Sequence, residues 1–273
     1  MTNIRSIEIP SWASFISHID ELSGGLKEDP WFRGQPEDWP LRPHLLRHLR
    51  RRGITDAQKA LAIEHSATNE FKRAAHLYLP PTRFQLLAGA EAVGTGLVDW
   101  WIVMRHHRAP TRLLDWTLSP FVAAYFASES PVEDNRRPPG VVWVLDLGAL
   151  RATMDTTYAA ADGNTRITDK HMTSLGAPND LLPLFHPMPT ERMLAQQGCF
   201  TVCRNVLGDH GEIIGQTTPT ALTRLLIPDQ VKEEFRERLR QVNLTGHTMF
   251  GQLDGLGRHT EETVAILADR SAR

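Results

Sequence analysis

The sequence predicts an α+β fold in which helices pack around a central mixed or antiparallel sheet. Strand-like segments are interspersed irregularly with helix-like segments, which argues against a doubly wound parallel sheet. The clearest strand, residues 140–146, is rich in β-branched residues and follows two prolines. A chain of 273 residues can bury one substantial core. We therefore expect a single domain with an N-terminal helical extension at 1–28, a core at about 29–257 and a C-terminal helix at 258–273.

Apolar periodicity, capping residues and prolines predict the individual elements. They are a helix at 10–25, a strand at 31–34, a helix from Thr55 to about Leu79, a helix at about 88–105, strands at 140–146, 198–206 and 222–227, and helices at 229–242 and 260–268. In the helix at 229–242, Val231, Phe235, Leu239 and Val242 are expected to face inward. The segment 153–189 has no period and predicts a long loop with no more than a short helix.

Charge balance and cysteine content exclude several classes of protein. The chain has 30 Lys and Arg against 32 Asp and Glu, so no overall field favours nucleic acid or a membrane. Two cysteines, Cys199 and Cys203, give neither a disulfide framework nor a zinc site, which fits a cytoplasmic protein. No apolar run approaches the roughly 20 residues that span a bilayer, so no membrane partner is expected.

A polar segment at residues 106–120, which leads into an apolar helix, marks the candidate site. Arg112 and Asp115 flank two leucines, and burying either charge requires a partner. Ser119 can cap the helix, and the proline after it suits the first helical position. The positive end of the helix dipole then faces Asp115, Thr117 and Ser119 and favours an anion there.

Arg33 is a second candidate, because it lies between an aromatic residue and a glycine on a predicted strand. A guanidinium group at this position can hold a phosphate or carboxylate by two parallel hydrogen bonds, and Gly34 would let a ligand approach the backbone. The alternative is a structural arginine paired with Asp115 or Glu191.

Another group of basic residues lies at 42–52. His44 and His48 are four residues apart, but five arginines and no carboxylate surround them, so a metal site is not expected. One interpretation is a solvated basic surface, and the other is a contact with RNA or another anionic ligand.

Three ordered motifs resemble those of the FRG domain family, which is named for its Phe-Arg-Gly tripeptide. They are Trp31-Phe32-Arg33-Gly34-Gln35, the central segment that includes Pro110-Thr111-Arg112, and the segment from Arg192 to Thr201. The resemblance extends from about residue 31 to residue 256. Family members usually read Gln-His-Tyr-Gly before Pro-Thr-Arg, whereas this chain has Arg105-His106-His107-Arg108.

The histidine that matches this motif, His106, is the one we assign to the site. It ends a predicted helix, and it could act as general acid, general base or phosphate ligand. Adjacent histidines point in different directions, so His107 is not expected in the same site. In the third motif, Gln197 offers an amide that can donate and accept hydrogen bonds, and Glu191 is the nearby carboxylate.

The order of these motifs is also similar to the plan of ADP-ribosyltransferases. That resemblance implies that Arg33 holds the phosphates of NAD, that Thr117 or Ser119 supports the nicotinamide ribose, and that Gln197 stands where those enzymes carry a glutamate. An amide cannot stabilise an oxocarbenium-like centre as a carboxylate does. Glu191 or Asp115 would therefore have to supply the negative charge.

The leading hypothesis is an enzyme of ADP-ribosyltransferase type that handles NAD or another nucleotide, acting as a bacterial toxin or in defence against phage. Arg33 would hold the pyrophosphate, His106 and Arg112 would complete the anion site, and a protein or nucleic acid would be the acceptor. One alternative is a binding module for RNA or nucleotides that uses the basic clusters and shows steep salt dependence. The other is a metal-independent ribonuclease that uses His106 and His107.

Overall fold

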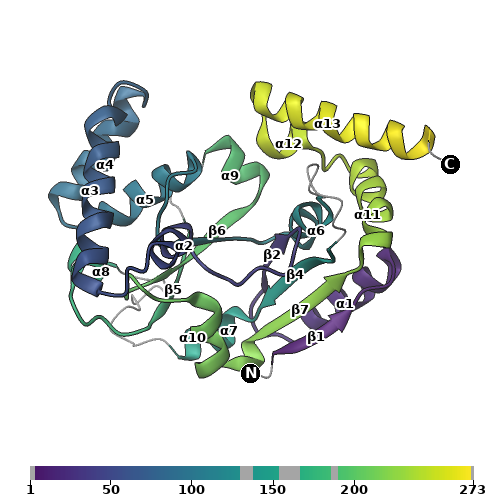
Figure 1. The fold of residues 1–273 in the computed structure, drawn as a ribbon, viewed down its shortest axis with the longest axis horizontal. Helices are drawn as coiled ribbons and strands as arrows, with labels where there is room; N and C mark the ends of the chain where they lie inside the picture. The colour runs from purple at the N-terminus through teal and green to yellow at the C-terminus, as the bar shows by residue number, and fades with distance from the viewer. Residues whose placement is uncertain (1–3, 130–137, 154–166, 186–189, 272–273) are drawn as a thin grey trace.

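The computed structural model describes residues 4–129, 138–153, 167–185 and 190–271 (Figure 1). Seven strands in these residues form one open mixed sheet in the order β1-β7-β4-β2-β3-β6-β5. Strands β1 and β7 pair in parallel, and all other neighbouring strands pair antiparallel. The predicted α+β class, with helices around a mixed sheet, is confirmed.

The bounds of the strands and helices are as follows. The strands are β1 (Arg5–Glu8), β2 (Trp31–Gln35), β3 (Leu113–Thr117), β4 (Gly140–Leu145), β5 (Leu181–Leu184), β6 (Gly198–Cys203) and β7 (Leu222–Ile227). The helices are α1 (Trp12–Gly24), α2 (His44–Arg51), α3 (Ala57–Ala75), α4 (Pro81–Ala92), α5 (Leu97–His106), α6 (Pro120–Ser128), α7 (Leu147–Ala152), α8 (Asp169–Thr173), α9 (Glu191–Ala195), α10 (His210–Thr217), the 3-10 helix η2 (Pro219–Ala221), α11 (Asp229–Gln241), α12 (Gly246–Phe250) and α13 (Gln252–Ser271).

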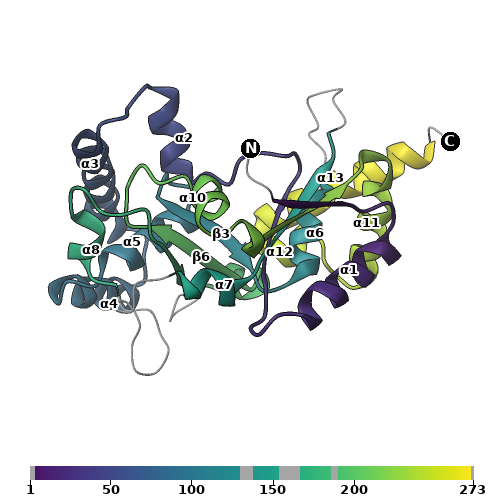
Figure 2. The same ribbon diagram turned by 90° about the horizontal axis from the view of Figure 1, so that it is seen from below.

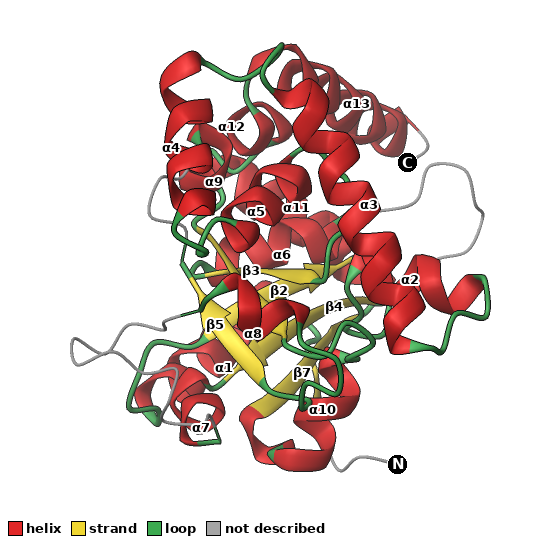
Figure 3. Ribbon diagram, turned by 90° about the vertical axis from the view of Figure 1, so that its left-hand side faces the viewer, coloured by secondary structure: helices red, strands yellow, loops and turns green. Residues whose placement is uncertain are grey.

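Two hydrophobic clusters cover the two faces of the sheet, because successive strand residues point to opposite sides. Phe32 belongs to the cluster formed with α1, α6 and α11. Its neighbour Trp31 belongs to the cluster formed with α7 and α10, and these two helices lie below the sheet in Figure 3. A third cluster packs α5, α8 and α9 against β5 and β6. Figures 1 and 2 place α2 to α5 and α8 at one end of the molecule and α1, α11 and α13 at the other.

Helix α6 lies so close to the sheet that two strand positions beneath it have no room for a side chain. A Cβ atom added to Gly34 would lie 1.8 Å from the carbonyl oxygen of Ala123, and one added to Gly140 would lie 2.0 Å from that of Ala127. Glycine in β2 and β4, opposite alanine in α6, therefore lets the helix backbone contact the strands directly. This contact fixes α6 over the centre of the sheet.

Several predicted boundaries are confirmed and others are wrong. Ser11 and Ser119 cap α1 and α6 by accepting hydrogen bonds from Ser14 and Val122. The helix expected from Thr55 to about Leu79 is α3, which is capped by Asp56 and runs from Ala57 to Ala75. The helix expected at 88–105 is two helices, α4 and α5, separated at Gly94, whose φ of 74° ends the first.

Other differences concern elements whose sequence signal is weak. Strand β1 and helix α2 were not expected, and the segment expected to be a loop at 153–189 contributes α8 and β5 within its described part. The short C-terminal helix expected at 260–268 is the longer α13. In α11, Phe235 and Leu239 are buried as expected, but Val242 follows the helix and is 61% exposed. No helix in the described ranges combines the length and the apolar character required to cross a bilayer.

Candidate functional site

A pocket of about 250 Å³ opens where β2, β3 and β6 meet the C-terminal end of α5 and helices α6 and α9. Residues from all three motifs line it, among them Arg33 from the first, His106 and Asp115 from the second, and Arg192 and Gln196 from the third. The sheet order explains the convergence, because β3 lies between β2 and β6. Segments far apart in the sequence therefore surround one hollow.

Strands β2 and β3 separate at the floor of the pocket. Their ladder consists of one pair, Phe32 with Thr117, whereas β2 pairs with β4 along its whole length. Beyond that pair, Nη1 of Arg33 donates a hydrogen bond of 2.7 Å to the carbonyl oxygen of Asp115. The guanidinium group of Arg33 therefore takes the place of a backbone hydrogen-bond partner at this point of β3. The side chain of Arg33 remains 17% exposed.

Asp115 holds two arginines in place. Nε of Arg105 lies 2.9 and 3.0 Å from its two carboxylate oxygens, and Nη1 of Arg33 lies 3.5 Å from Oδ2. Burial alone would raise the pKa of Asp115, but the charges of Arg105 and Arg33 outweigh this effect and lower it to about 2. Burial lowers the pKa of Arg33 to about 10, against the opposing charge of Asp115. All three groups are therefore ionised at neutral pH.

Positive charge exceeds negative charge in this pocket. Of the residues that the structure describes, four arginines line it, Arg33, Arg105, Arg108 and Arg192, against one carboxylate, Asp115. In the same ranges neither Arg108 nor Arg192 forms an ion pair, and the guanidinium of Arg192 stacks 4.6 Å from the ring centre of Phe250. Burial, followed by the charges of Arg108 and Arg258, lowers the pKa of Arg192. Such an uncompensated group of cations favours an anionic ligand.

His106 lies beside this cluster as a neutral imidazole. Burial, together with the positive charges of His107, Arg192 and Arg83, lowers its pKa to about 4. Its Nδ1 is 3.2 Å from the hydroxyl oxygen of Thr190, the residue that caps α9. The expected assignment of His106 to the site is consistent with its position in the pocket lining, which does not include His107.

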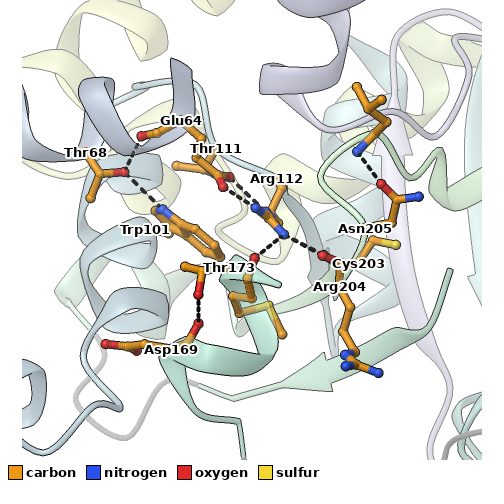
Figure 4. A network of polar contacts seen from close by, with 12 residues as sticks. Glu64, Thr68, Trp101, Thr111, Arg112, Asp169, Thr173, Cys203, Arg204 and Asn205 are labelled. Carbon is orange, nitrogen blue, oxygen red and sulfur yellow. Dashed lines mark hydrogen bonds and ion pairs between the residues drawn. The ribbon is translucent and has the colours of Figure 1, made fainter. Parts of the chain in front are cut away.

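Arg112, expected to complete the anion site, lies elsewhere, in the network of Figure 4. It is 1% exposed and forms a two-pronged ion pair with Glu64 of α3. Its Nη1 also donates to the carbonyl oxygens of Met172 and Arg204, at 3.1 and 2.7 Å, and its guanidinium lies 4.7 Å from the ring centre of Trp101. These contacts engage all three guanidinium nitrogens, so Arg112 joins α3, β3, α8 and the end of β6.

Three other expected ligand positions have structural roles. The hydroxyl of Thr117 lines the pocket, but it donates to the carbonyl oxygen of Gln196 and accepts from the backbone N–H of Ser119. Ser119 caps α6 and is not part of the lining. Gly34 does line the pocket, yet the space that its missing side chain provides is filled by the backbone of α6.

Glu191 and Gln197 lie outside the lining. Glu191 is exposed in the first turn of α9, and Gln197 is exposed in the left-handed turn, with φ of 46°, that joins α9 to β6. The preceding residue, Gln196, lines the pocket instead, and its Nε2 donates to the carbonyl oxygen of Met249 at 3.1 Å. The amide that reaches the pocket is therefore that of Gln196, one residue before the expected Gln197.

Sequence reasoning also left Arg105, Arg108 and Arg192 out of the site. All three belong to the motifs that indicated the site, and the first two flank the pair of histidines. The signal that could have identified them is the excess of arginine over acid within those motifs. In the described parts of the chain, no cluster of three or more histidine, cysteine or acidic side chains has the arrangement of a metal site.

Residues 28–136 match the family model of the FRG domain. The chain contains an FRG domain. The match includes the first two motifs and ends before β4, so the third motif, with Arg192 and Gln196, lies outside it. No curated protein and no solved structure matches the chain significantly.

Proposed function

We propose that the pocket binds the phosphate-bearing part of a nucleotide, with NAD as the leading candidate. The observation that carries the proposal is the arginine cluster, in which Asp115 orients Arg33 and Arg105 while Arg108 and Arg192 have no acidic partner among the described residues. Arginine suits this ligand because its planar donors match the oxygens of a phosphate group.

The volume of the pocket indicates that it would enclose one half of a dinucleotide, not the whole molecule. Its volume of about 250 Å³ is slightly below the usual range of ligand pockets, about 300–1,000 Å³. Phe126 and Phe200 line it together with the arginines, so that apolar surface is available beside the charges. The other half of NAD would then extend from the opening.

An ADP-ribosyltransferase reaction would place two further demands on this site. The bond between ribose and nicotinamide breaks as the nucleophile of the acceptor attacks, nicotinamide leaves, and the acceptor loses a proton. Neutral His106 is the lining residue suited to accept that proton. Asp115 is the carboxylate in the lining and stays negative at neutral pH, but two arginines already hold it. The arrangement therefore supports nucleotide binding more directly than it supports transfer.

Calorimetric titration with NAD, ADP-ribose, ADP and uncharged adenosine would test the binding proposal. We expect the three phosphate-bearing ligands to bind and adenosine to bind at least about tenfold more weakly, since charge-assisted hydrogen bonds contribute about 1.5–3 kcal/mol each. Arg192→Ala should weaken the binding of the charged ligands by a similar factor. Arg73→Ala is the matched control, because Arg73 is an exposed arginine of α3 that pairs with Glu70 away from the pocket.

Equal affinity for adenosine and ADP, or an Arg192→Ala variant that binds ADP as well as the wild type, would contradict the proposal. Incubation with NAD labelled in the adenosine moiety, in the presence of protein, DNA and RNA acceptors, separates binding from transfer. Transfer of the label to an acceptor, with release of nicotinamide, that is lost in His106→Gln while NAD still binds would support the transferase reaction. Binding without release would restrict the function to recognition.

A further inference from the structure

Helix α2 presents a row of basic side chains on its surface. His44, Arg47, His48 and Arg51 are spaced three and four residues apart, so they share one face of the helix. The opposite face, with Leu45, Leu46 and Leu49, is buried in the core. Arg47 and Arg51 are exposed.

The arginines around α2 divide into two groups. Arg42 and Arg50 form ion pairs with Asp209 and Glu212 of the α10 segment, so acids already compensate their charge. Within the described ranges no carboxylate pairs with Arg47, Arg51 or Arg52, and α2 itself contains no acidic residue. The uncompensated charges are therefore those of the exposed basic face and of Arg52, which follows it.

Helix α2 adjoins the arginine pocket. The backbone N–H of Leu45 donates a hydrogen bond of 3.1 Å to the carbonyl oxygen of Thr111, which lies just before β3 and its pocket residue Asp115. The charges of the pocket residues Arg105 and Asp115 act on Arg47, and Arg47 in turn is one of the charges that lower the pKa of Arg33. The same two pocket residues act on His44 at the start of α2. Burial and the neighbouring positive charges of Arg47 and Arg105 lower the pKa of His44 to about 4, so the positive charge of the face comes from its arginines.

We propose that the basic face of α2 binds the phosphodiester backbone of a single-stranded nucleic acid and holds the strand next to the pocket. The proposal goes beyond nucleotide binding in the pocket, because it concerns a separate surface and a polymeric ligand. Eight helical residues extend about 12 Å, a length along which successive guanidinium groups can follow a strand. A single strand suits the position, since a nucleotide within a duplex is not available to a neighbouring pocket.

The overall charge of the chain limits how it could bind a nucleic acid. The formal charge is −2, so a general attraction between polyelectrolytes cannot account for binding. Affinity for a nucleic acid must come from a local group of cations and must fall steeply with salt concentration.

Fluorescence anisotropy with labelled single-stranded RNA and DNA of mixed sequence, measured over a series of salt concentrations, tests the proposal. The test variant is Arg47→Ala/Arg51→Ala. The matched control is Arg238→Ala/Arg240→Ala, which removes the same charge from exposed positions on α11, at the other end of the molecule in Figures 1 and 2. Comparison of the RNA and DNA arms identifies which strand is preferred.

We expect the α2 variant to bind at least about tenfold more weakly and to lower the salt slope by about 1.4, since each lost contact with a single strand removes about 0.7. The α11 variant should bind like the wild type. ADP binding, measured by calorimetry, should weaken much less in the α2 variant than in Arg192→Ala, because Arg47 and Arg51 do not line the pocket and act on it only through their charge. A loss of ADP binding in Arg192→Ala alone therefore tests the pocket separately.

Three results would overturn the proposal. One is wild-type protein that binds neither RNA nor DNA at low salt. Another is equal weakening in the α2 and α11 variants, which would show that total charge, and not this surface, governs binding. The third is polyglutamate that competes as well as RNA does, because it would indicate an acidic protein as the partner.

Discussion

Each residue of the Phe-Arg-Gly tripeptide has a different role in the fold. Phe32 packs in the core against α6, Arg33 bridges the gap between β2 and β3, and Gly34 lets the backbone of α6 contact the sheet. The motif therefore couples the position of α6 to the position of the guanidinium group in the pocket. Three consecutive residues therefore combine a packing requirement with the placement of a pocket side chain.

Gly34→Ala tests the packing requirement. The new methyl group would meet the carbonyl oxygen of Ala123 at 1.8 Å, and helix backbone cannot move as a flexible side chain can. We expect the free energy of unfolding to fall by about 3 kcal/mol, at the upper end of the cost of overpacking. Urea denaturation followed by circular dichroism measures it.

Gly89→Ala provides the control for that substitution. Gly89 lies within α4, and no atom lies within 4 Å of the position that a new methyl group would take there. Since glycine destabilises a helix interior by about 0.5–1 kcal/mol relative to alanine, this substitution should stabilise the protein by a similar amount. If both substitutions changed stability in the same direction, close contact between α6 and β2 would not be the reason for glycine at position 34.

The pocket could be predicted from residues only in part. Arg33, His106 and Asp115 carry signals of their own: a charged side chain on a strand, a histidine at a helix end and an acid beside buried leucines. The sequence could not show which arginine pairs with Asp115, because Arg105 is ten residues away and Arg112 only three. The pairing depends on how α5 packs against β3, which is a property of the fold.

At the scale of elements, the ion pair between Glu64 and Arg112 attaches α3 to the sheet. Both side chains are almost fully buried, and Arg112 also bonds carbonyl groups at α8 and after β6. The hydroxyl of Thr68, one turn after Glu64, accepts a hydrogen bond of 3.2 Å from Trp101 of α5 (Figure 4). The network therefore holds α3 against α5, whose C-terminal end forms one side of the pocket.

Glu64→Gln should destabilise the protein by about 3 kcal/mol or more, because it leaves the buried charge of Arg112 without its counterion. Glu70→Gln on the same helix is the control. Glu70 pairs with Arg73 at the surface, where both side chains are more than 70% exposed, and such pairs contribute about 1 kcal/mol or less. Similar losses in the two variants, measured by urea denaturation, would refute the anchoring role of the buried pair.

The elements that could be predicted are those whose signal is local. Strand β4 has a run of β-branched residues, and α1 and α6 have serine caps, so their positions follow from neighbouring residues. Strands β1 and β5 have only four residues each and occupy the edges of the sheet. They form because β7 and β6 offer backbone partners, and this long-range pairing leaves little trace in so short a sequence.

At the scale of the whole molecule, the sheet order produces the site. The family match ends at residue 136, whereas β6 and α9, which complete the pocket, lie after residue 190. The order of the three motifs along the chain is compatible with a common pocket. It does not by itself bring the motifs together. Antiparallel pairing of β3 with β6 brings the third motif to the pocket, and that pairing is a result of the complete fold.

The buried histidines should make the stability of the whole molecule depend on pH. His210 is fully buried, its Nδ1 lies 2.9 Å from the hydroxyl oxygen of Thr201, and burial, followed by the charge of Arg33, lowers its pKa to about 3. Between pH 6.5 and this value the unfolded chain binds more protons at the ring than the folded chain does. The free energy of unfolding should therefore fall as the pH falls through this window, whereas the charge on His210 has no effect above it.

His210→Gln measures this contribution. At about pH 5 the wild type should have lost about 2 kcal/mol through His210 relative to about pH 7.5, since each pKa unit corresponds to 1.36 kcal/mol. The variant starts from a lower stability, because glutamine fills the site less well, but its loss between the two values should be smaller by that amount. Asp115, whose pKa of about 2 lies below this window, stays ionised and does not contribute. Urea denaturation at both pH values gives the four free energies. Equal losses in the two proteins would show that His210 has the same pKa in the folded and the unfolded chain, contrary to its burial.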